Sequence, residues 1–437
     1  MSTTIQFPIS RIEGHAKVVV NLDHGKVLNA RFLAQEYRGF EQFLKGMPAE
    51  QMPVIVPRVC GVCSTSHHLA AVEALEDAYD VKPPPVAEKI RHLMMVGQLV
   101  QNQATSLFFF TLPDKLQATS IFGADESASK DVLGSISKKA MAVRKIGTEL
   151  IAIAGGQFIH PVKAVVGGVV SGIDKAAAKE MRKKIKAAIP IACSLFDEYW
   201  QLSQKMTKAV GDWEGDDPFY YMIAVDKNDP TRPVDHVTMQ KSDGSETVTF
   251  RPEDFRENLQ FHQVQDSFSA KTSFNDLPIR ANSLARMNLI ESMGTPIANG
   301  YLERFRVQFG SPAHQILLFD LCRGIELING LERADRLLAE NLMDGEMSVP
   351  VEPRDGFGYG LVEAPRGPLI HHYQIENGLI VNVEFVIPTV HNNFSIERAL
   401  TTMAKRFVHE DRIDMGLDSA MGWVVRAFDP CIACATH

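Results

Sequence analysis

Two pairs of cysteines are the residues of this sequence whose type and spacing point most directly to chemistry. Cys60 and Cys63 enclose Gly-Val near the start of the chain, and Cys431 and Cys434 enclose Ile-Ala at its end. One short loop in each pair can aim two thiolates at a common point. Four thiolates select soft or borderline metal ions, so the two pairs together predict one metal site.

The spacing of the cysteines leaves three kinds of metal site open. A structural zinc ribbon usually takes its pairs from positions about 15–20 residues apart, whereas these pairs stand at opposite ends of the chain. Redox disulfide chemistry favours one Cys-x-x-Cys beside a βαβ unit, a pattern that the flanking sequence does not show. Structural zinc, an iron–sulfur cluster and a catalytic metal centre therefore remain. Cys193 and Cys322 lie in apolar helical patterns and are predicted to be buried, inert thiols.

The composition is that of a globular protein with a large core. The chain has 437 residues, of which 45% are hydrophobic and 22% charged, and its formal net charge is −8. Lys and Arg are scattered, so a basic face for nucleic acid is not expected. No apolar run reaches the roughly 18–20 residues of a membrane span. Few cysteines, and an N-terminus without the pattern of a secretory signal, predict a reducing, cytoplasmic setting.

Periodicity predicts a mainly α body of the α+β class, with a long central helix bundle and small peripheral β-sheets. Hairpins are expected around His24-Gly25, around Ser242–Gly244 and at Asn377-Gly378. Apolar residues at three- and four-residue steps predict a long helix from Val86 to Phe110. Further helices are expected from about Lys130 to Ala154, from the N-cap Asp174 to Val210 with a kink or an end at Pro190, from Arg304 to Glu340, and from Ser395. The lysines after Asp174 are expected on a solvated face.

Short motifs around the cysteines carry a resemblance that covers nearly the whole chain. They are Ser10–His15, Arg58–His68, Ile159–Pro161 with Gly167-Gly168, Leu284–Asn288, Glu363–Gly367, Pro388-Thr389 and Asp429–His437. In these motifs and their order the sequence resembles the large, catalytic subunits of nickel–iron hydrogenases. Its compact length and its Cys-Ser-Thr-Ser-His-His run look most like the cytoplasmic multimeric branch, which is linked to NAD(P), F420, ferredoxin or a heterodisulfide reductase.

The resemblance implies a single catalytic domain, residues 1–437, whose N- and C-terminal segments meet at the metal centre. Its expected activity is the reversible heterolytic cleavage of H2 to protons and electrons. Cys60 and Cys431 would bind nickel terminally, and Cys63 and Cys434 would bridge nickel to an iron that carries carbon monoxide and two cyanides. Because no cysteine set remains for clusters, the electrons would pass to an iron–sulfur small subunit, docked to this chain with further electron-transfer subunits. An ending at His437 resembles the mature form that a protease releases from the family's precursors.

The resemblance also assigns roles around the metals, each with a simpler alternative. Glu13 would be the first proton relay, or else a surface carboxylate paired with Arg11. Arg366, paired with Asp429, would reach over the metals, or else form a structural ion pair. Pro365 and Thr389 would line the cyanide-facing pocket, or else serve packing alone.

Two more sets of residues complete the expected site. His67, one helical turn after Cys63, would approach the bridging sulfur, or else be an ordinary core histidine. Glu41, the Phe385 carbonyl and His437 would bind magnesium, or iron, near the C-terminus; an exposed helix carboxylate is the alternative for Glu41. The chain departs from many relatives at 101–103, where Gln-Asn-Gln replaces a triplet that contains histidine, which puts the surroundings of the metals there in doubt.

Two rival readings use the same residues. The fold is shared with the quinone-linked subunit of respiratory complex I, but that relative has lost the cysteine pairs, which are intact here. A zinc-stabilised binding module is the other, and metal content would separate it, since it would hold no nickel. The sequence does not identify the electron acceptor, the oxygen tolerance, the favoured direction of the reaction or the full subunit composition.

Overall fold

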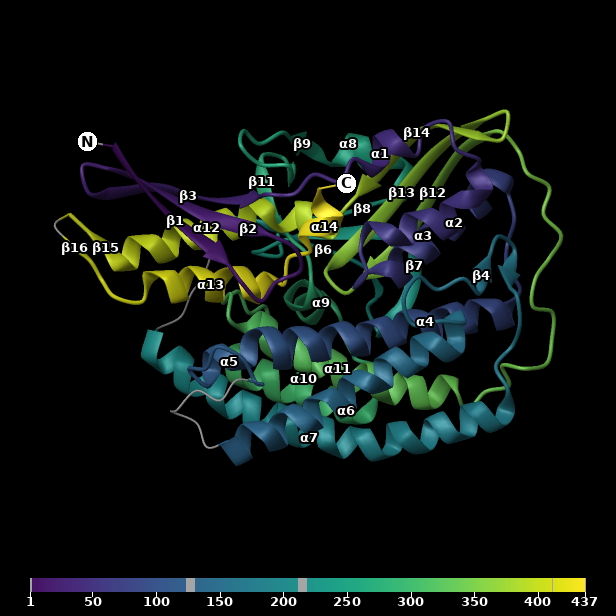
Figure 1. Cartoon of the computed structure of the whole chain (residues 1–437), viewed down its shortest axis with the longest axis horizontal. Helices are drawn as coiled ribbons and strands as arrows, with labels where there is room; N and C mark the ends of the chain where they lie inside the picture. The colour runs from purple at the N-terminus through teal and green to yellow at the C-terminus, as the bar shows by residue number, and fades with distance from the viewer. Residues whose placement is uncertain (1, 123–129, 211–217, 411, 437) are drawn as a thin grey trace.

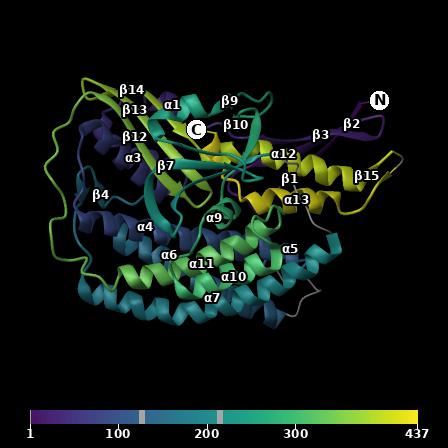
Figure 2. The ribbon, with the colours of Figure 1, turned by 180° about the vertical axis from the view of Figure 1, so that it is seen from behind.

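The chain is a mixture of helices and sheets arranged in two layers with a protruding arm. The computed structural model describes residues 2–122, 130–210, 218–410 and 412–436. Helices hold 49% of the chain and strands 24%. The long helices lie together along one side of the molecule, the larger sheets lie on the other, and both views agree on this arrangement (Figures 1 and 2).

Five helices make up the helical layer. They are α4 (Pro85–Ala104), α6 (Lys130–Gly155), α7 (Lys175–Val210), α10 (Pro296–Phe309) and α11 (Leu318–Leu337). Helix α4 begins with a proline in its first turn, where the missing N–H costs nothing. It continues into a π-helical segment, Thr105–Thr111, and then α5 (Leu112–Lys115).

Two predicted helix boundaries are wrong, although most elements are found where the sequence predicts them. Helix α7 runs through Pro190 without ending there, and Asp174 caps it, since its Oδ1 accepts from the N–H groups of residues 176 and 177. The stretch predicted as one helix over 304–340 is two helices, because Gly310 takes a positive φ of 89° and ends α10.

The strands form three main sheets, one of them larger than the small sheets that the sequence predicts. The six-stranded sheet has the order β8-β7-β6-β11-β10-β9 and joins β6 to β11 in parallel. Its strands are β6 (Tyr220–Asp226), β7 (Asp229–Lys241), β8 (Thr247–Phe250), β9 (Gln260–His262), β10 (Lys271–Phe274) and β11 (Leu277–Arg280). The three-stranded sheets are β1 (Ser2–Ile9), β2 (Ala16–Asp23) and β3 (Lys26–Ala34), and β12 (Gly356–Ala364), β13 (Gly367–Glu376) and β14 (Leu379–Val386). Two short ribbons, β4-β5 (164–165 and 168–169) and β15-β16 (408–409 and 412–413), complete the set.

Helix α3 (Ser64–Tyr79) is held unusually close to strand β12. A side chain at Gly358 or Gly360 would place its Cβ 2.0 Å or 2.1 Å from the carbonyl oxygens of Ala74 and Ala70. Only glycine permits this approach. The strand therefore fixes the depth of α3, whose first turn follows Cys63.

The C-terminal helices bring the end of the chain back into the core. Helices α12 (Pro388–Phe407) and α13 (Leu417–Phe428) pack together in the arm, and α14 (Ile432–Ala435) lies inside the body (Figure 1). All four residues of α14 are buried. The remaining short elements are α1 (Phe40–Phe43), α2 (Met52–Ile55), α8 (Phe255–Asn258), α9 (Ser283–Leu289), and the 3-10 turns 49–51, 56–59 and 252–254.

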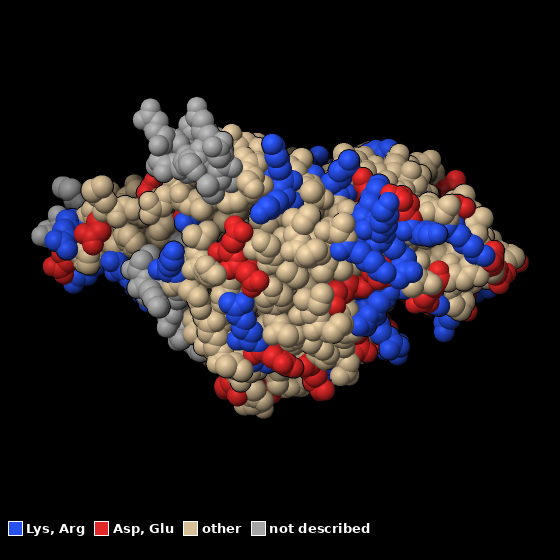
Figure 3. Space-filling view, turned by 90° about the horizontal axis from the view of Figure 1, so that it is seen from below, with Lys and Arg blue, Asp and Glu red and all other residues tan. Residues whose placement is uncertain are grey.

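The surface of the helical layer mixes both signs of charge. Basic and acidic side chains alternate over this face of the molecule (Figure 3). Lys179, Lys183, Lys184 and Lys186 of α7 are exposed, as predicted for a solvated face. Among the described residues, none of the helices has both the length and the apolar composition that crossing a membrane requires.

Candidate metal centre

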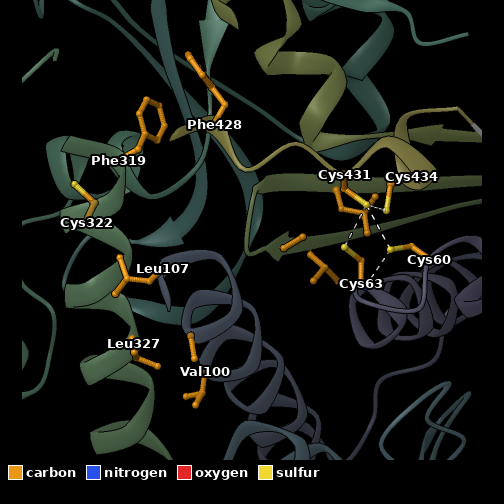
Figure 4. Close-up of a cluster of buried hydrophobic side chains, with 14 of the residues drawn as sticks. Cys60, Cys63, Val100, Leu107, Phe319, Cys322, Leu327, Phe428, Cys431 and Cys434 are labelled. Carbon is orange, nitrogen blue, oxygen red and sulfur yellow. Dashed lines mark hydrogen bonds between the residues drawn. The ribbon is translucent and has the colours of Figure 1, made fainter. Parts of the chain in front are cut away.

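The four predicted cysteine ligands converge on one point in the core. The Sγ atoms of Cys60, Cys63, Cys431 and Cys434 all lie within 4.8 Å of one another, and all four residues are buried (Figure 4). The Sγ of Cys431 is 3.4 Å from that of Cys60, 3.7 Å from that of Cys63 and 2.8 Å from that of Cys434. Among the described residues this is the one cluster of three or more Cys, His, Asp or Glu side chains that could hold a metal ion.

Local backbone turns aim each pair of sulfurs inward. Cys60 leaves the 3-10 turn 56–59 in an extended conformation, and Cys63 is the N-cap of α3. The Cys63 N–H points to the Cys60 sulfur at 3.4 Å. At the other end, Asp429 takes a left-handed conformation (φ 48°) after α13 and turns the chain into Pro430 and Cys431.

The N-terminal motif closes over the second pair of cysteines. Residues 13 and 431 form an isolated parallel bridge, in which the Ile432 N–H donates to the Glu13 carbonyl at 3.0 Å. The Glu13 carboxylate accepts from the Ala433 N–H at 2.9 Å and lies 3.1 Å from the Cys431 sulfur. Burial, with the negative charge of Cys60 beside it, raises the pKa of Glu13 to about 6. The placement is that of a proton acceptor beside a ligand sulfur.

The donor set and its electrostatics fit a soft metal centre. Hydrogen bonds from Cys431 and Cys434 lower the pKa of Cys60 and Cys63, whereas burial raises the pKa of Cys431 and Cys434. Four negative sulfurs cannot share so small a buried space without cations to balance them. Thiolates are the ligands that nickel and low-valent iron accept, and hard ions such as magnesium do not prefer them.

Arg366 supplies one of the balancing charges. Its Nη1 donates to the Cys63 sulfur at 3.2 Å and its Nη2 to the Asp429 carboxylate at 3.1 Å, while Nε donates to the Asp429 carbonyl. Burial opposes the charge, but Asp429 and the cysteine sulfurs hold the pKa of Arg366 well above its usual range. Asn102 donates to the other side of Asp429 at 3.2 Å. The departing triplet therefore contributes to this charge pair.

Thr389 and Pro365 lie where the sequence predicts them, in the pocket beside the cysteines. The Thr389 hydroxyl accepts from the Cys431 N–H at 3.0 Å, so it positions the ligand loop itself. The Pro365 carbonyl accepts from Arg286 at 2.8 Å. Both residues are buried.

His67 is the start of a chain of three buried polar side chains. Its Nε2 lies 3.3 Å from the Cys434 sulfur, and its Nδ1 lies 3.0 Å from Nε2 of His371. The Nδ1 of His371 in turn lies 3.0 Å from the hydroxyl of Tyr373. Neither His371 nor Tyr373 was identified from the sequence, although their two-residue spacing in a predicted strand places them on one face.

The predicted magnesium site is described only in part. The Glu41 carboxylate accepts from the Phe385 N–H at 2.8 Å, which brings two of the three predicted ligands together. The Arg38 N–H donates to the Thr436 carbonyl at 2.9 Å, so the end of the chain lies beside this segment. His437 lies outside the described residues. Glu41 is half-buried rather than exposed.

A buried charged network behind Pro365 was not predicted from the sequence. Arg286 pairs with Glu326 and Glu363, and Gln103 donates to Glu326 at 2.5 Å. These residues border a cavity of about 570 Å³ between α3, α4, β7 and β12, which reaches Glu73 and Pro365. Burial raises the pKa of Glu363 to about 7 and that of Glu73 to about 8. Periodic motifs do not reveal such groups, because each stands singly in its own element.

The two remaining cysteines lie apart from the site. Cys322 is buried as predicted, but the prediction of a buried Cys193 is wrong, because its position on α7 leaves it half-buried. Burial nevertheless raises the pKa of both thiols.

The comparisons identify the family. A model described as nickel-dependent hydrogenase matches residues 38–145 and 244–437, and one described as HoxL-like matches residues 4–37. The chain belongs to the nickel-dependent hydrogenases. It is a large subunit of that family and thus an oxidoreductase.

Its relatives fall in the multimeric branch that the motifs indicated. A subunit of the F420-non-reducing hydrogenase vhu of Methanocaldococcus jannaschii is 33% identical over 91% of this chain and 97% of its own length. The beta subunit of the NAD-reducing hydrogenase HoxS of Cupriavidus necator is 31% identical over 98% of this chain and 93% of its own.

Solved structures agree with the fold over its full length. An NAD+-reducing [NiFe]-hydrogenase in the H2-reduced state has a TM-score of 0.89 at 30% identity and covers 100% of this chain and 99% of that one. The Ni-Fe-Se hydrogenase from D. vulgaris Hildenborough, at 22% identity and a TM-score of 0.82, is similar in fold alone and covers 100% of both chains.

Proposed function

We propose that this chain is the subunit in which H2 is reversibly cleaved to two protons and two electrons. The observation that carries the proposal is the convergence of Cys60, Cys63, Cys431 and Cys434 within 4.8 Å, with Glu13 and Arg366 against their sulfurs. A zinc site would need the four sulfurs alone. A carboxylate and a guanidinium at the same sulfurs are the additions that a proton-transfer reaction requires.

The cysteines would hold a nickel and an iron carrying one carbon monoxide and two cyanides, with Cys60 and Cys431 on nickel and Cys63 and Cys434 shared by both metals. When bound, this group supplies the site at which the H–H bond is polarised and the two electrons are taken up. Thr389, Pro365 and Arg366 would line the side on which the iron's small ligands lie.

Glu13 is the residue that would take the proton. Its carboxylate stands 3.1 Å from the Cys431 sulfur and is held there by the Ala433 N–H. A raised pKa brings its affinity for protons nearer to neutral pH, which suits a group that must both accept and release them. Arg366 and Asp429 remain charged and orient the pocket.

The electrons require an exit that this chain does not contain, since Cys193 and Cys322 are its only other cysteines. An iron–sulfur small subunit would receive them. Further subunits would pass them to NAD(P), F420, ferredoxin or a heterodisulfide reductase. The NAD-reducing hydrogenase among the relatives supports the first of these acceptors. Such an assembly would work in the cytoplasm.

A second metal near the C-terminus is part of the proposal. Glu41, the Phe385 carbonyl and His437 would bind magnesium or iron, since oxygen ligands with one imidazole suit either ion. The contact between the Glu41 carboxylate and the Phe385 N–H at 2.8 Å supports this placement of two of the three.

H2-dependent reduction of a viologen dye by the purified complex tests the activity. We expect Cys60→Ser to abolish it and to remove nickel, because a terminal thiolate ligand is lost. Cys193→Ser is the matched control, in which the same atom is replaced in a half-buried cysteine outside the site. Full activity of the Cys60→Ser complex would refute the proposed function.

A further inference from the structure

The chain of side chains from His67 to Tyr373 ends inside the protein. Its three contacts join the Cys434 sulfur, both rings of the histidine pair and one phenol hydroxyl, at 3.3 Å, 3.0 Å and 3.0 Å. Tyr373 has an exposed fraction of 0%, and His371 likewise. A path that carries protons to solvent would need an exposed end, so a role in orientation fits the geometry better.

The phenol hydroxyl determines the direction of every hydrogen bond in this chain. Burial raises the pKa of Tyr373 well above its usual range, so the hydroxyl keeps its proton. Among the described residues, Nδ1 of His371 is the hydrogen-bond partner of this oxygen. A buried O–H without an acceptor is costly, so the phenol donates and Nδ1 of His371 accepts.

The remaining protons follow from the two tautomers of imidazole. A His371 ring that accepts at Nδ1 carries its proton on Nε2, and this proton is donated to Nδ1 of His67. His67 must then carry its own proton on Nε2, which faces the sulfur of Cys434. The opposite direction would turn a nitrogen lone pair toward a negatively charged sulfur.

Neighbouring elements hold the chain rigid and dry. His371 and Tyr373 lie on the same face of β13, two residues apart. Phe385 stands opposite His371 in the β13–β14 register, and its ring centroid is 4.5 Å from that of His371 and 6.2 Å from that of His67.

We infer that Tyr373 is a positioning residue, which acts through His371 to fix His67 as a permanent hydrogen-bond donor to Cys434. The inference rests on the proposed function, in which Cys434 is the thiolate that bridges the two metals. A donated hydrogen bond withdraws electron density from such a thiolate and so from the iron beside it. Partners of this kind orient metal ligands and tune the metal.

Infrared spectroscopy of the complete hydrogenase complex tests this inference. In Tyr373→Phe, His371 is free to take either tautomer and the donor to Cys434 is no longer fixed. More electron density then reaches the iron, so the carbon monoxide band should move to lower wavenumber or split. The turnover rate should fall about 10-fold, at the lower end of the effects known for such partners.

Tyr221→Phe is the matched control, because its hydroxyl also bonds a histidine, at 2.7 Å from Nδ1 of His314. This pair is not part of the described metal centre, and we expect unchanged bands and turnover. A double variant tests the route: in a His67→Ala background, Tyr373→Phe should produce no further band shift.

Each outcome decides the question. Bands of Tyr373→Phe that match those of Tyr221→Phe would overturn the inference, and so would an added shift in the His67→Ala background. Loss of nickel from Tyr373→Phe but not from Tyr221→Phe would also overturn it, because the tyrosine would then serve assembly. If the unmodified complex showed no carbon monoxide or cyanide bands, the proposed function itself would fail.

Discussion

Glu13 and Cys431 are paired as neighbouring strands, although nearly the whole chain separates them. The Ile432 N–H donates to the Glu13 carbonyl at 3.0 Å, and the Glu13 carboxylate lies 3.1 Å from the Cys431 sulfur. The two ends of the chain therefore build the metal centre jointly. The N-terminal motif cannot take its place until the C-terminal segment has entered the core.

Gly14 tests this closure. It has a φ of 80°, and a Cβ there would lie 2.7 Å from the Cβ of Ile432. We expect Gly14→Ala to prevent the pairing of the two segments and to lower nickel content and activity together. Gly46→Ala is the matched control, since Gly46 has a φ of 84° with nothing within 4 Å. It should lose about 1–2 kcal/mol from backbone strain and keep its nickel. Equal nickel in both variants would show that close pairing at Gly14 is not needed.

Glu13→Gln tests the proton acceptor. The amide keeps the size of the side chain and can still accept from the Ala433 N–H, but it cannot take up a proton. We expect nickel content to be unchanged and H2 oxidation to fall by about 10²–10⁴-fold. Turnover near that of the unmodified complex would mean that protons leave by another group.

Arg366→Lys separates charge from geometry. One ammonium cannot reproduce the three contacts of the guanidinium with Cys63 and Asp429. Activity should fall about 10–100-fold with the metals still bound. Arg304→Lys, at an exposed ion pair with Asp197, is the control and should change little. If Arg366→Lys lacked nickel, the arginine would belong to assembly rather than to the reaction.

How far the sequence predicts the site depends on whether its residues stand in motifs. The cysteine pairs, Glu13 and Arg366 occur in runs that resemble a known family, and the structure brings all of them together. Tyr373 and Glu326 stand alone in an ordinary strand and helix, so their role depends on tertiary contacts that no local pattern carries.

The same distinction holds for the fold. Hairpins at Asn377-Gly378 and near Gly244 were predictable from turn chemistry alone. The parallel pairing of β6 with β11 joins distant segments and was not. Pro190 was expected to kink or end α7, but the helix continues past it, because packing can hold a helix through a proline that propensity alone disfavours.

Glu73 predicts a pH dependence of stability. Its pKa rises from 4.5 in the unfolded chain to about 8 in the folded protein, because of burial. Between these values the folded state binds more protons than the unfolded state, so the free energy of unfolding falls as pH rises from about 4.5 to 8. Each pKa unit corresponds to about 1.4 kcal/mol.

Glu73→Gln removes this dependence, since an amide does not titrate. Relative to the unmodified protein, the variant should gain thermal stability at pH 8 compared with pH 5. Thermal unfolding midpoints at both values measure the effect. Glu88→Gln, at an exposed glutamate on the same cavity, controls for the change of charge. The same shift in both variants would contradict the assignment to Glu73.

Metal analysis joined to infrared spectroscopy of the purified complex tests the central claim most directly. We expect about one nickel in this chain, an iron in the same site, and infrared bands from one carbon monoxide and two cyanides, all of which Cys60→Ser should lose. Zinc in place of nickel, with no such bands, would show that the four cysteines form a structural site and would contradict the account.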